Sequence, residues 1–194
     1  MDTLAKESRG FLRALGAYAL AAVVSALAVD SSLAQSEVQA SEYRVKAAFL
    51  YKFGAYIEWP DGSFQRPDSP LVIGVLGADA LAEELAQIVA GRNVNGRPVS
   101  VRKLRAGGSI EGLHILFVGR GDGGRLAEIL ASAKGRPLLT VTESEQALEL
   151  GSMINFVLVD DKVRFDVSLL PADLGSVKIS ARLLAVARKV VKPS

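Results

Sequence analysis

Cysteine is absent from the 194-residue sequence, and histidine and tryptophan occur once each, as His114 and Trp59. Without cysteine the chain cannot form a disulfide, carry a lipid on an N-terminal cysteine or respond to redox state through a thiol. A zinc or copper site would need His114 together with carboxylates, which is a poor donor set for these metals. A serine hydrolase is poorly supported too, because there is no G-x-S-x-G motif and only one histidine to act as the base.

A large charge of one sign is also lacking. The chain carries 23 basic and 21 acidic residues, which gives a net charge of +2. A nearly neutral chain does not present the electrostatic footprint of a nucleic-acid-binding protein. The length suits a single domain with one hydrophobic core, and we find no internal repeat.

The longest apolar run covers residues 14–29 and follows three basic residues within positions 6–13. The run has 16 residues, which is fewer than the roughly 20 needed to span a bilayer. Small residues surround position 34, as they do at a signal-peptide cleavage site. The pattern predicts a cleaved export signal over residues 1–34, followed by a domain over residues 35–194; an uncleaved membrane anchor is the alternative.

Hydrophobic periodicity after this segment predicts helices that alternate with strands. In the first helix Ser41 is the expected N-cap, and Val45, Ala48, Phe49 and Phe53 are expected on the apolar face. Helices are predicted from Ser41 to Trp59 and from Asp79 to Gly91, and over residues 122–133, 143–150 and 177–191; strands are predicted over residues 71–76, 98–104, 113–118, 137–141, 153–159 and 162–168.

The order of these elements predicts an α/β fold. A single domain is expected, with a parallel or mixed central sheet, helices on both faces and a late antiparallel hairpin. Turn residues are predicted at Asn95-Gly96 and, in the late hairpin, at Asp160-Asp161. Residues 60–70 contain three prolines and are expected to form an exposed loop.

Two motifs could form part of a binding or catalytic site, or could have a structural role only. Residues 119–124 match G-x-G-x-x-G after a predicted strand, as in a dinucleotide site, but they follow the third strand rather than the first, so a glycine-rich turn is favoured and no cofactor is expected. His114 lies in the most apolar strand, where a histidine is usually buried and paired with a backbone carbonyl; a role in a site would need an exposed ring.

Three further side chains are candidate contacts. Arg97 follows a turn, and Arg164 lies on the polar face of a half-buried strand, so either guanidinium could bind an anion or a carboxylate of a partner; surface arginines are more often only solvated. Trp59, next to a loop, could anchor the first helix in the core or contact a partner.

Several segments together resemble one family. They occur in the family's order: residues 45–53 (VKAAFLYKF), 58–60 (EWP), 71–77 (LVIGVLG), 95–99 (NGRPV), 114–118 (HILFV), 139–142 (LTVT), 151–156 (GSMINF), 163–167 (VRFDV) and 177–184 (VKISARLL). No segment is specific alone, but their order and spacing from about Glu42 to Arg188 are similar to the YfiR family of exported proteins.

The resemblance implies a role as a non-enzymatic periplasmic repressor. Such proteins bind the periplasmic sensor region of an inner-membrane diguanylate cyclase of the YfiN type, and so lower cyclic di-GMP and biofilm formation. An outer-membrane lipoprotein of the YfiB type relieves the repression, and family members can form homodimers. Partner or ligand contacts are expected at Trp59, Arg97, Arg164 and Lys178, since each lies on a matched segment outside the expected core.

Two departures from the family pattern bear on regulation. Family members often carry disulfides, with one cysteine just before the histidine, where this chain has Leu113. Redox control of repression is therefore not expected here. Ser152 replaces a glycine often seen before Met-Ile, which is a mild change. A second functional class stays open: a periplasmic small-ligand-binding sensor module that acts on another membrane signalling or transport protein, with a pocket at the carboxyl ends of the strands.

Overall fold

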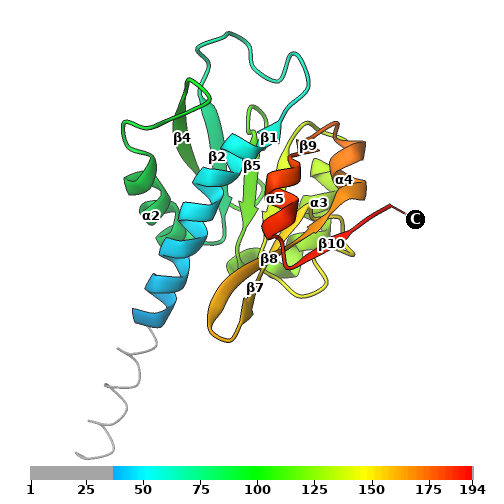
Figure 1. Ribbon diagram of the computed structural model, residues 1–194. Coiled ribbons are helices and arrows are strands. Elements are labelled where there is room, and N and C mark those ends of the chain that lie inside the picture. The colour runs from blue at the N-terminus through cyan, green and yellow to red at the C-terminus, as the bar shows by residue number, and fades with distance from the viewer. Residues whose placement is uncertain (1–36, 194) are drawn as a thin grey trace, which may run out of the picture. The chain divides into compact units, whose positions relative to one another are not determined.

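The computed structural model describes residues 37–193, and residues 42–193 belong to one compact unit (Figure 1). The predicted export signal over residues 1–34 lies outside the described residues. Residues 37–41 are helical, so Ser41 lies inside a helical segment and does not cap its start. Among the described residues no helix is long and apolar enough to cross a membrane.

One eight-stranded sheet runs through the unit, in the strand order β10-β8-β7-β6-β5-β2-β4-β3. Its strands in chain order are β2 (Leu71–Leu76), β3 (Asn93–Val94), β4 (Arg97–Leu104), β5 (Ile115–Val118), β6 (Leu139–Thr142), β7 (Ile154–Val159), β8 (Lys162–Ser168) and β10 (Lys189–Val191). A separate two-stranded ribbon pairs β1 (Ile57–Glu58) with β9 (Lys178–Ile179) in antiparallel fashion.

The sheet is mixed and mostly parallel, which confirms the predicted class. The five adjacent strands β4, β2, β5, β6 and β7 run parallel to one another, and the short edge strand β3 is antiparallel to β4. Strand β8 turns back antiparallel to β7, and β10 then runs parallel to β8. Asp160 and Asp161 both have positive φ angles, 48° and 57°, which is the geometry of the two-residue hairpin turn predicted there.

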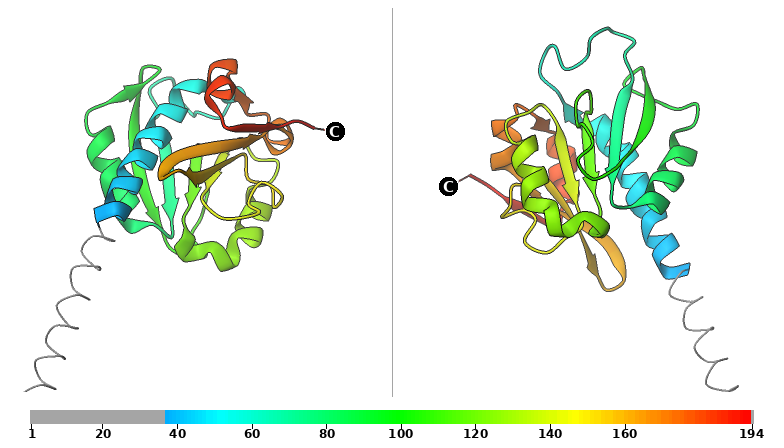
Figure 2. Two further views of the ribbon diagram at one scale, coloured as in Figure 1. Left: turned by 60° about the horizontal axis from the view of Figure 1, so that its bottom comes forward. Right: turned by 180° about the vertical axis from the view of Figure 1, so that it is seen from behind.

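Helices cover both faces of the sheet because strand side chains alternate between two apolar cores. One core joins the odd-numbered positions of β2, β5 and β6 to α2 (Asp79–Val89), α5 (Ala181–Val186) and the helix formed by residues 42–53, called helix 42–53 here. The even-numbered positions of β2 and β5 pack against α3 (Leu126–Ala133). Figure 2 shows α3 on the side opposite helix 42–53.

Five of the seven phenylalanines gather in the first core. Phe49 and Phe53 of helix 42–53 lie against Phe156 and Phe165 of the late hairpin, with ring centroids 5.2 to 6.0 Å apart, and Phe117 of β5 contacts Phe156 at 6.3 Å. Aromatic pairs at these separations add to the free energy gained by burial alone. The sparse aromatic residues of this chain therefore serve mainly to bind helix 42–53 to the hairpin.

The apolar face of the first helix was predicted about one residue out of register. The buried positions are Tyr43, Lys46, Ala47, Leu50 and Phe53, whereas Val45 is 41% exposed. The helix also ends earlier than predicted, at residue 53, and a 3₁₀ turn, η1 (Gly54–Tyr56), leads into β1. A lysine at a core position hides the true face, because periodicity arguments count it as polar.

Two of the predicted helices are wrong. Residues 143–150 form turns, with Gln146 in the left-handed region at φ 57°. Residues 177–191 form β9, the short helix α5 and β10, while Val186 is 65% exposed. Residues 177–191 form strands because unpaired strand edges are available to them. Strand β10 hydrogen-bonds to the backbone of β8, and β9 hydrogen-bonds to that of β1. The chain also forms 3₁₀ helix η2 (Arg120–Arg125) ahead of α3, and α4 (Leu169–Leu174), which was not predicted.

Candidate functional site

The parallel strands give the sheet two chemically different edges. The edge where β2 and β5 begin, at Leu71 and Ile115, is called the amino edge here. The edge where β2, β5 and β6 end is called the carboxyl edge, which in parallel sheets is the usual place for ligands. Residues singled out from the sequence lie mainly at the amino edge, and a cluster that the sequence did not reveal lies at the carboxyl edge.

Trp59 and Lys178 come together at the β1–β9 ribbon. Glu58 pairs with Lys178 across this ribbon, and Trp59 follows directly. Both residues line a hollow of about 520 Å³, with Glu58, Pro60, Asp61 and Asp173 among the other lining residues. Trp59 is half-buried and Lys178 is exposed. The hollow therefore offers an aromatic edge and a free cation within one concave surface.

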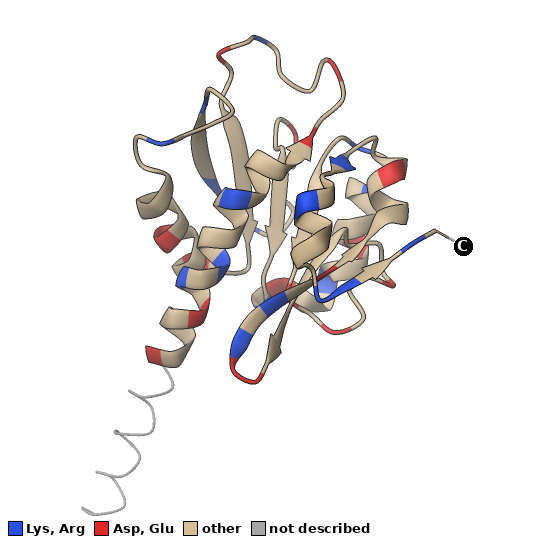
Figure 3. Ribbon diagram, viewed as in Figure 1, with Lys and Arg blue, Asp and Glu red and all other residues tan. Residues whose placement is uncertain are grey.

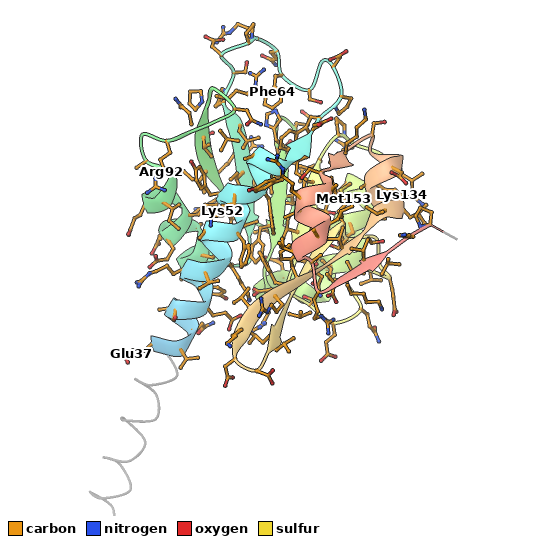
Figure 4. The ribbon with its side chains drawn as sticks, viewed as in Figure 1. Glu37, Lys52, Phe64, Arg92, Lys134 and Met153 are labelled. Atoms are coloured by element: carbon orange, nitrogen blue, oxygen red, sulfur yellow. The ribbon has the colours of Figure 1, made fainter. Side chains whose placement is uncertain are left out.

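The indole of Trp59 is held by the neighbouring strand. Its Nε1–H donates to the carbonyl oxygen of His114 at 3.3 Å, and its ring meets those of Phe64 and His114 edge to face, each at 5.9 Å. Phe64 comes from the loop of residues 60–70, drawn at the top of Figure 4. Trp59 therefore serves as an anchor for the chain after β1 and still borders the hollow.

His114 fastens this loop to the sheet. Its Nδ1 accepts from the backbone N–H of Val72 at 3.1 Å, so Nε2 carries the proton and donates to the carbonyl of Ser63 at 3.1 Å. Burial lowers the pKa of His114, and the positive charge of Arg97 lowers it further, while the bond to Ser63 opposes this shift. The ring is thus a neutral structural connector, as the sequence favoured, and it lies one residue before β5.

Arg97 completes the amino edge. Its Nη1 donates to the carbonyls of Arg66, Pro67 and Ser69 at 2.7 to 3.1 Å, and its guanidinium lies 3.9 Å from the centroid of Phe64. Phe64 in turn stacks on His114 at 4.1 Å. Guanidinium, phenyl and imidazole groups therefore form one stack, which holds the proline-rich loop in a single position; we call it the loop stack.

Arg164 lies apart from the other three candidates. It is on β8, paired with Val157 of β7 in the half of the hairpin next to the turn, and its side chain is exposed. The hairpin and the β1–β9 ribbon lie at opposite ends of the molecule (Figure 1). The described residues place no acidic partner on Arg164 or on Lys178, so both cations face solvent. Figure 3 shows further basic residues along the same hairpin.

The glycine-rich segment packs two turns together. A Cβ on Gly119 would lie 2.6 Å from the carbonyl oxygen of Gly77, and one on Gly121 would lie 2.8 Å from it. The N–H of Gly121 donates to that carbonyl at 3.3 Å. Glycine is needed here because the loops after β2 and β5 touch backbone to backbone.

A buried charge cluster holds the carboxyl edge. Lys46, 1% exposed, forms ion pairs with Glu42 and with Glu143, whose side chain is fully buried. Glu143 also accepts from the backbone N–H of Arg120 at 3.1 Å, and the Arg120 guanidinium reaches Glu42 at 3.2 Å. Two cations and two carboxylates balance one another, which is the condition under which charges are tolerated in an interior.

Sequence analysis missed this cluster. Its members come from positions 42 and 46 of one helix, 120 after β5 and 143 after β6, so no local motif links them. The one available signal was Lys46, which lies four residues before Leu50 and three after Tyr43 on the buried stripe. A lysine at such a position indicates a buried partner. Within residues 37–193 no group of three or more metal-ligating side chains is arranged to hold a metal ion.

The comparisons with known proteins agree with this architecture. No curated protein matches the sequence significantly. A profile of the YfiR/HmsC-like family matches residues 43–188. The matched region starts inside helix 42–53 and ends just before β10, so it includes the ribbon, the loop stack and most of the carboxyl-edge cluster. Because the match covers most of the chain, this protein belongs to the YfiR/HmsC-like family.

Proposed function

We propose that this protein is a periplasmic regulator that represses an inner-membrane diguanylate cyclase of the YfiN type by binding its periplasmic sensor region. The observation that carries the proposal is the family match over residues 43–188. Repression of such a cyclase lowers cyclic di-GMP and biofilm formation. By the same resemblance, an outer-membrane lipoprotein of the YfiB type relieves the repression, and the protein forms a homodimer.

The hollow beside Trp59 is the proposed main contact with the partner. An aromatic side chain at the border of a concave surface is a frequent centre of binding energy in protein interfaces. Lys178 has no acidic partner in the described chain and can pair with a carboxylate of the cyclase. In this proposal Arg97 acts indirectly, because its guanidinium holds the loop of residues 60–70 beside Trp59.

Arg164 is the proposed second contact. Its exposed guanidinium projects from a strand that is paired with β7 at this position, so binding would have to order little more than the rotamers of Arg164 itself. Since the hairpin and the ribbon lie at opposite ends of the molecule, one cyclase subunit would use one contact and a second subunit or an outer-membrane partner would use the other.

The test is recovery of the partner from membranes. The full chain, tagged at its C-terminus and produced in its own host, is recovered from the periplasm and used to capture detergent-solubilised inner-membrane proteins, which are identified by mass spectrometry. A diguanylate cyclase should be captured, and cells that overproduce the chain should contain less cyclic di-GMP. Capture of transporter components or kinases alone would contradict the cyclase assignment.

Substitutions locate the contact. Lys178→Glu and Trp59→Ala should each weaken capture at least about 10-fold, as expected for a residue central to an interface. Lys52→Glu is the matched control, because Lys52 is exposed on helix 42–53 and makes no ion pair within the described chain (Figure 4). Equal capture by Lys178→Glu and by the unchanged protein would place the contact elsewhere.

A second candidate function is supported by a specific feature. The carboxyl edge holds a pocket of about 430 Å³ beside the charge cluster, within the size range of small-molecule sites. A small-ligand sensor module that acts on another membrane signalling or transport protein would use such a pocket. The two functions are compatible, since a ligand can change the affinity for a protein partner.

A further inference from the structure

The pocket at the carboxyl edge exists because two neighbouring strands end at different heights. Strands β6 and β7 share only two residue pairs, Val141 with Ile154 and Thr142 with Asn155. Strand β7 continues to Val159 in pairing with β8, while β6 has ended. Residues 156–159 therefore have no strand beside them on the β6 side, and the pocket lies over this step.

The base of the pocket is fixed by the charge cluster. Lys46 and Glu143 line it from helix 42–53 and from the end of β6, and Arg120 lines it from η2. The buried charges already neutralise one another, so the base neither attracts nor repels an ion strongly. Its contribution is rigidity, because three separate elements meet in one network of buried hydrogen bonds.

Asn155 supplies an unused hydrogen-bond donor. Its Oδ1 accepts from the Thr142 hydroxyl at 2.7 Å and from the N–H of Ser144 at 3.2 Å, which fixes the orientation of the amide. The residue is 7% exposed and lines the pocket. No group in the described part of the chain accepts from its Nδ2. Since no buried side-chain nitrogen of the described residues lacks a partner, this N–H₂ is open to the pocket. An amide held in a fixed orientation there is suited to an anionic or carbonyl oxygen.

Other polar groups around the pocket favour a single negative charge. The guanidinium of Arg120 donates one N–H to Glu42. Its side chain is 53% exposed, so the remaining N–H donors are accessible to a ligand. Glu145 lines the pocket at its exposed rim. A carboxylate there disfavours multiply charged anions such as phosphate esters by repulsion, whereas a single ligand carboxylate can accept from the remaining Arg120 donors and from the Asn155 N–H₂.

An apolar wall completes the pocket. Phe156, Val157 and Leu158 line it along the unpaired part of β7, and Leu158 is 48% exposed. Covering this wall would remove apolar surface from water, which favours a ligand with a hydrocarbon or aromatic body. We propose that the pocket binds a small organic monocarboxylate, with its carboxylate on Asn155 Nδ2 and the Arg120 guanidinium and its apolar body on Phe156 and Leu158.

The proposal is independent of the cyclase partner and is tested on the purified full chain. Hexanoate and phenylacetate are titrated, with hexanamide as the uncharged control, and binding is followed by the shift of the unfolding midpoint and by calorimetry. Both carboxylates should give a saturable shift at concentrations up to about 10 mM, and hexanamide a much smaller one. Absence of saturable carboxylate binding would overturn the proposal.

Two variants assign the binding to this pocket. Asn155→Asp keeps the acceptor oxygen used by Thr142 and Ser144 and replaces the N–H₂ donor by an oxygen, so it should weaken hexanoate at least about 10-fold. Arg120→Gln should weaken hexanoate binding by a similar factor. This variant alone tests the assignment if Asn155→Asp does not fold. Arg125→Gln in the same 3₁₀ segment is the control and should leave the affinity unchanged. Unchanged affinity in both pocket variants would overturn the assignment.

Discussion

The two edges of the parallel sheet fix chain segments by different physical means. At the carboxyl edge, ion pairs tie helix 42–53 to two segments: Lys46 with Glu143 after β6, and Glu42 with Arg120 after β5. At the amino edge, the loop of residues 60–70 is tied through neutral and cation–π contacts, with His114 as the connector. One edge depends on charge balance, and the other depends on a ring that must stay uncharged.

Because of this difference, the two edges should respond differently to salt and to pH. Buried ion pairs are weakly screened by salt, so helix 42–53 should hold its place while the ionic strength changes. A neutral histidine that accepts a backbone hydrogen bond loses that bond when it is protonated. The loop of residues 60–70, next to the proposed partner surface, is therefore the more responsive region.

Removing the buried ammonium should have the largest effect. Lys46→Met leaves Glu143 buried without its cation, and we expect a loss of about 3–5 kcal/mol in the free energy of unfolding, measured in urea. Lys52→Met, on the exposed side of the same helix, should change it by less than about 0.5 kcal/mol. Adding Glu143→Gln to Lys46→Met should restore part of the loss; no recovery would mean that packing rather than charge explains the effect.

Closing the glycine contact should have the next largest effect. A Cβ at Gly119 would lie 2.6 Å from the Gly77 carbonyl oxygen and 2.7 Å from Ala78 Cβ, so Gly119→Ala should cost about 1–3 kcal/mol of stability. Gly124→Ala is the control, because a Cβ there meets no atom within 4 Å. Equal thermal unfolding midpoints for the two variants would contradict the close approach of the loops after β2 and β5.

Loosening the loop stack should have a smaller effect. Arg97→Lys keeps the charge but loses the planar fork, so bonds to the carbonyls of residues 66–69 weaken and about 1 kcal/mol of stability should be lost. Chymotrypsin should cleave after Phe64, in the same loop, several-fold faster. Arg105→Lys, at an exposed position whose side chain makes no hydrogen bond within the described residues, should leave the cleavage rate unchanged. Equal rates in both variants would show that the loop does not depend on Arg97.

Titrating His114 should have the smallest effect. The pKa of His114 is lowered in the folded protein, so the unfolded chain, with a histidine pKa of about 6.5, takes up the proton first. The stabilisation is complete above that value and is lost as the pH falls from it through the lower pKa of the folded state. Urea unfolding between about pH 5 and pH 7.5 should show this decrease.

His114→Gln is the matched control for the titration. A glutamine can accept from Val72 and donate to Ser63 but does not titrate, so its stability should vary less over this pH range. The same pH dependence in both proteins would assign the effect to other groups, and it would remove the contrast between the two edges.

The sequence was sufficient where local pattern and tertiary structure agree. The strands β2, β4, β5, β6, β7 and β8, the hairpin turn at Asp160-Asp161 and the class of the sheet were predicted, because alternation and turn chemistry act within a few residues. The C-terminal segment was not, since residues 189–191 form a strand only because β8 has an open edge to pair with. Helical spacing of apolar residues in this segment was outweighed by backbone pairing from outside it.

In the functional clusters, too, features set by the local sequence were predicted and features set by tertiary structure were not. His114 was expected to be a structural member of its segment, and its environment at the amino edge agrees with that expectation. For Trp59 both an anchoring role and a partner contact were left open, and its contacts with His114 and Phe64 are those of an anchor. The grouping of Lys46, Arg120 and Glu143 could not be predicted, because it depends on how far each strand extends and on the true face of helix 42–53. Contact with a partner at Trp59, Arg97, Arg164 and Lys178 stays a prediction for the capture experiment.

Strand β10 has a consequence for handling the protein. Three residues, Lys189–Val191, pair with residues 166–168 of the seven-residue strand β8, and the ion pair between Arg188 and Asp166 holds them there. A truncation before Arg188 would uncover a longer strand with free N–H and C=O groups, which is a template for assembly between chains. The last few residues thus protect the solubility of the whole sheet, and any C-terminal fusion should begin after Ser194.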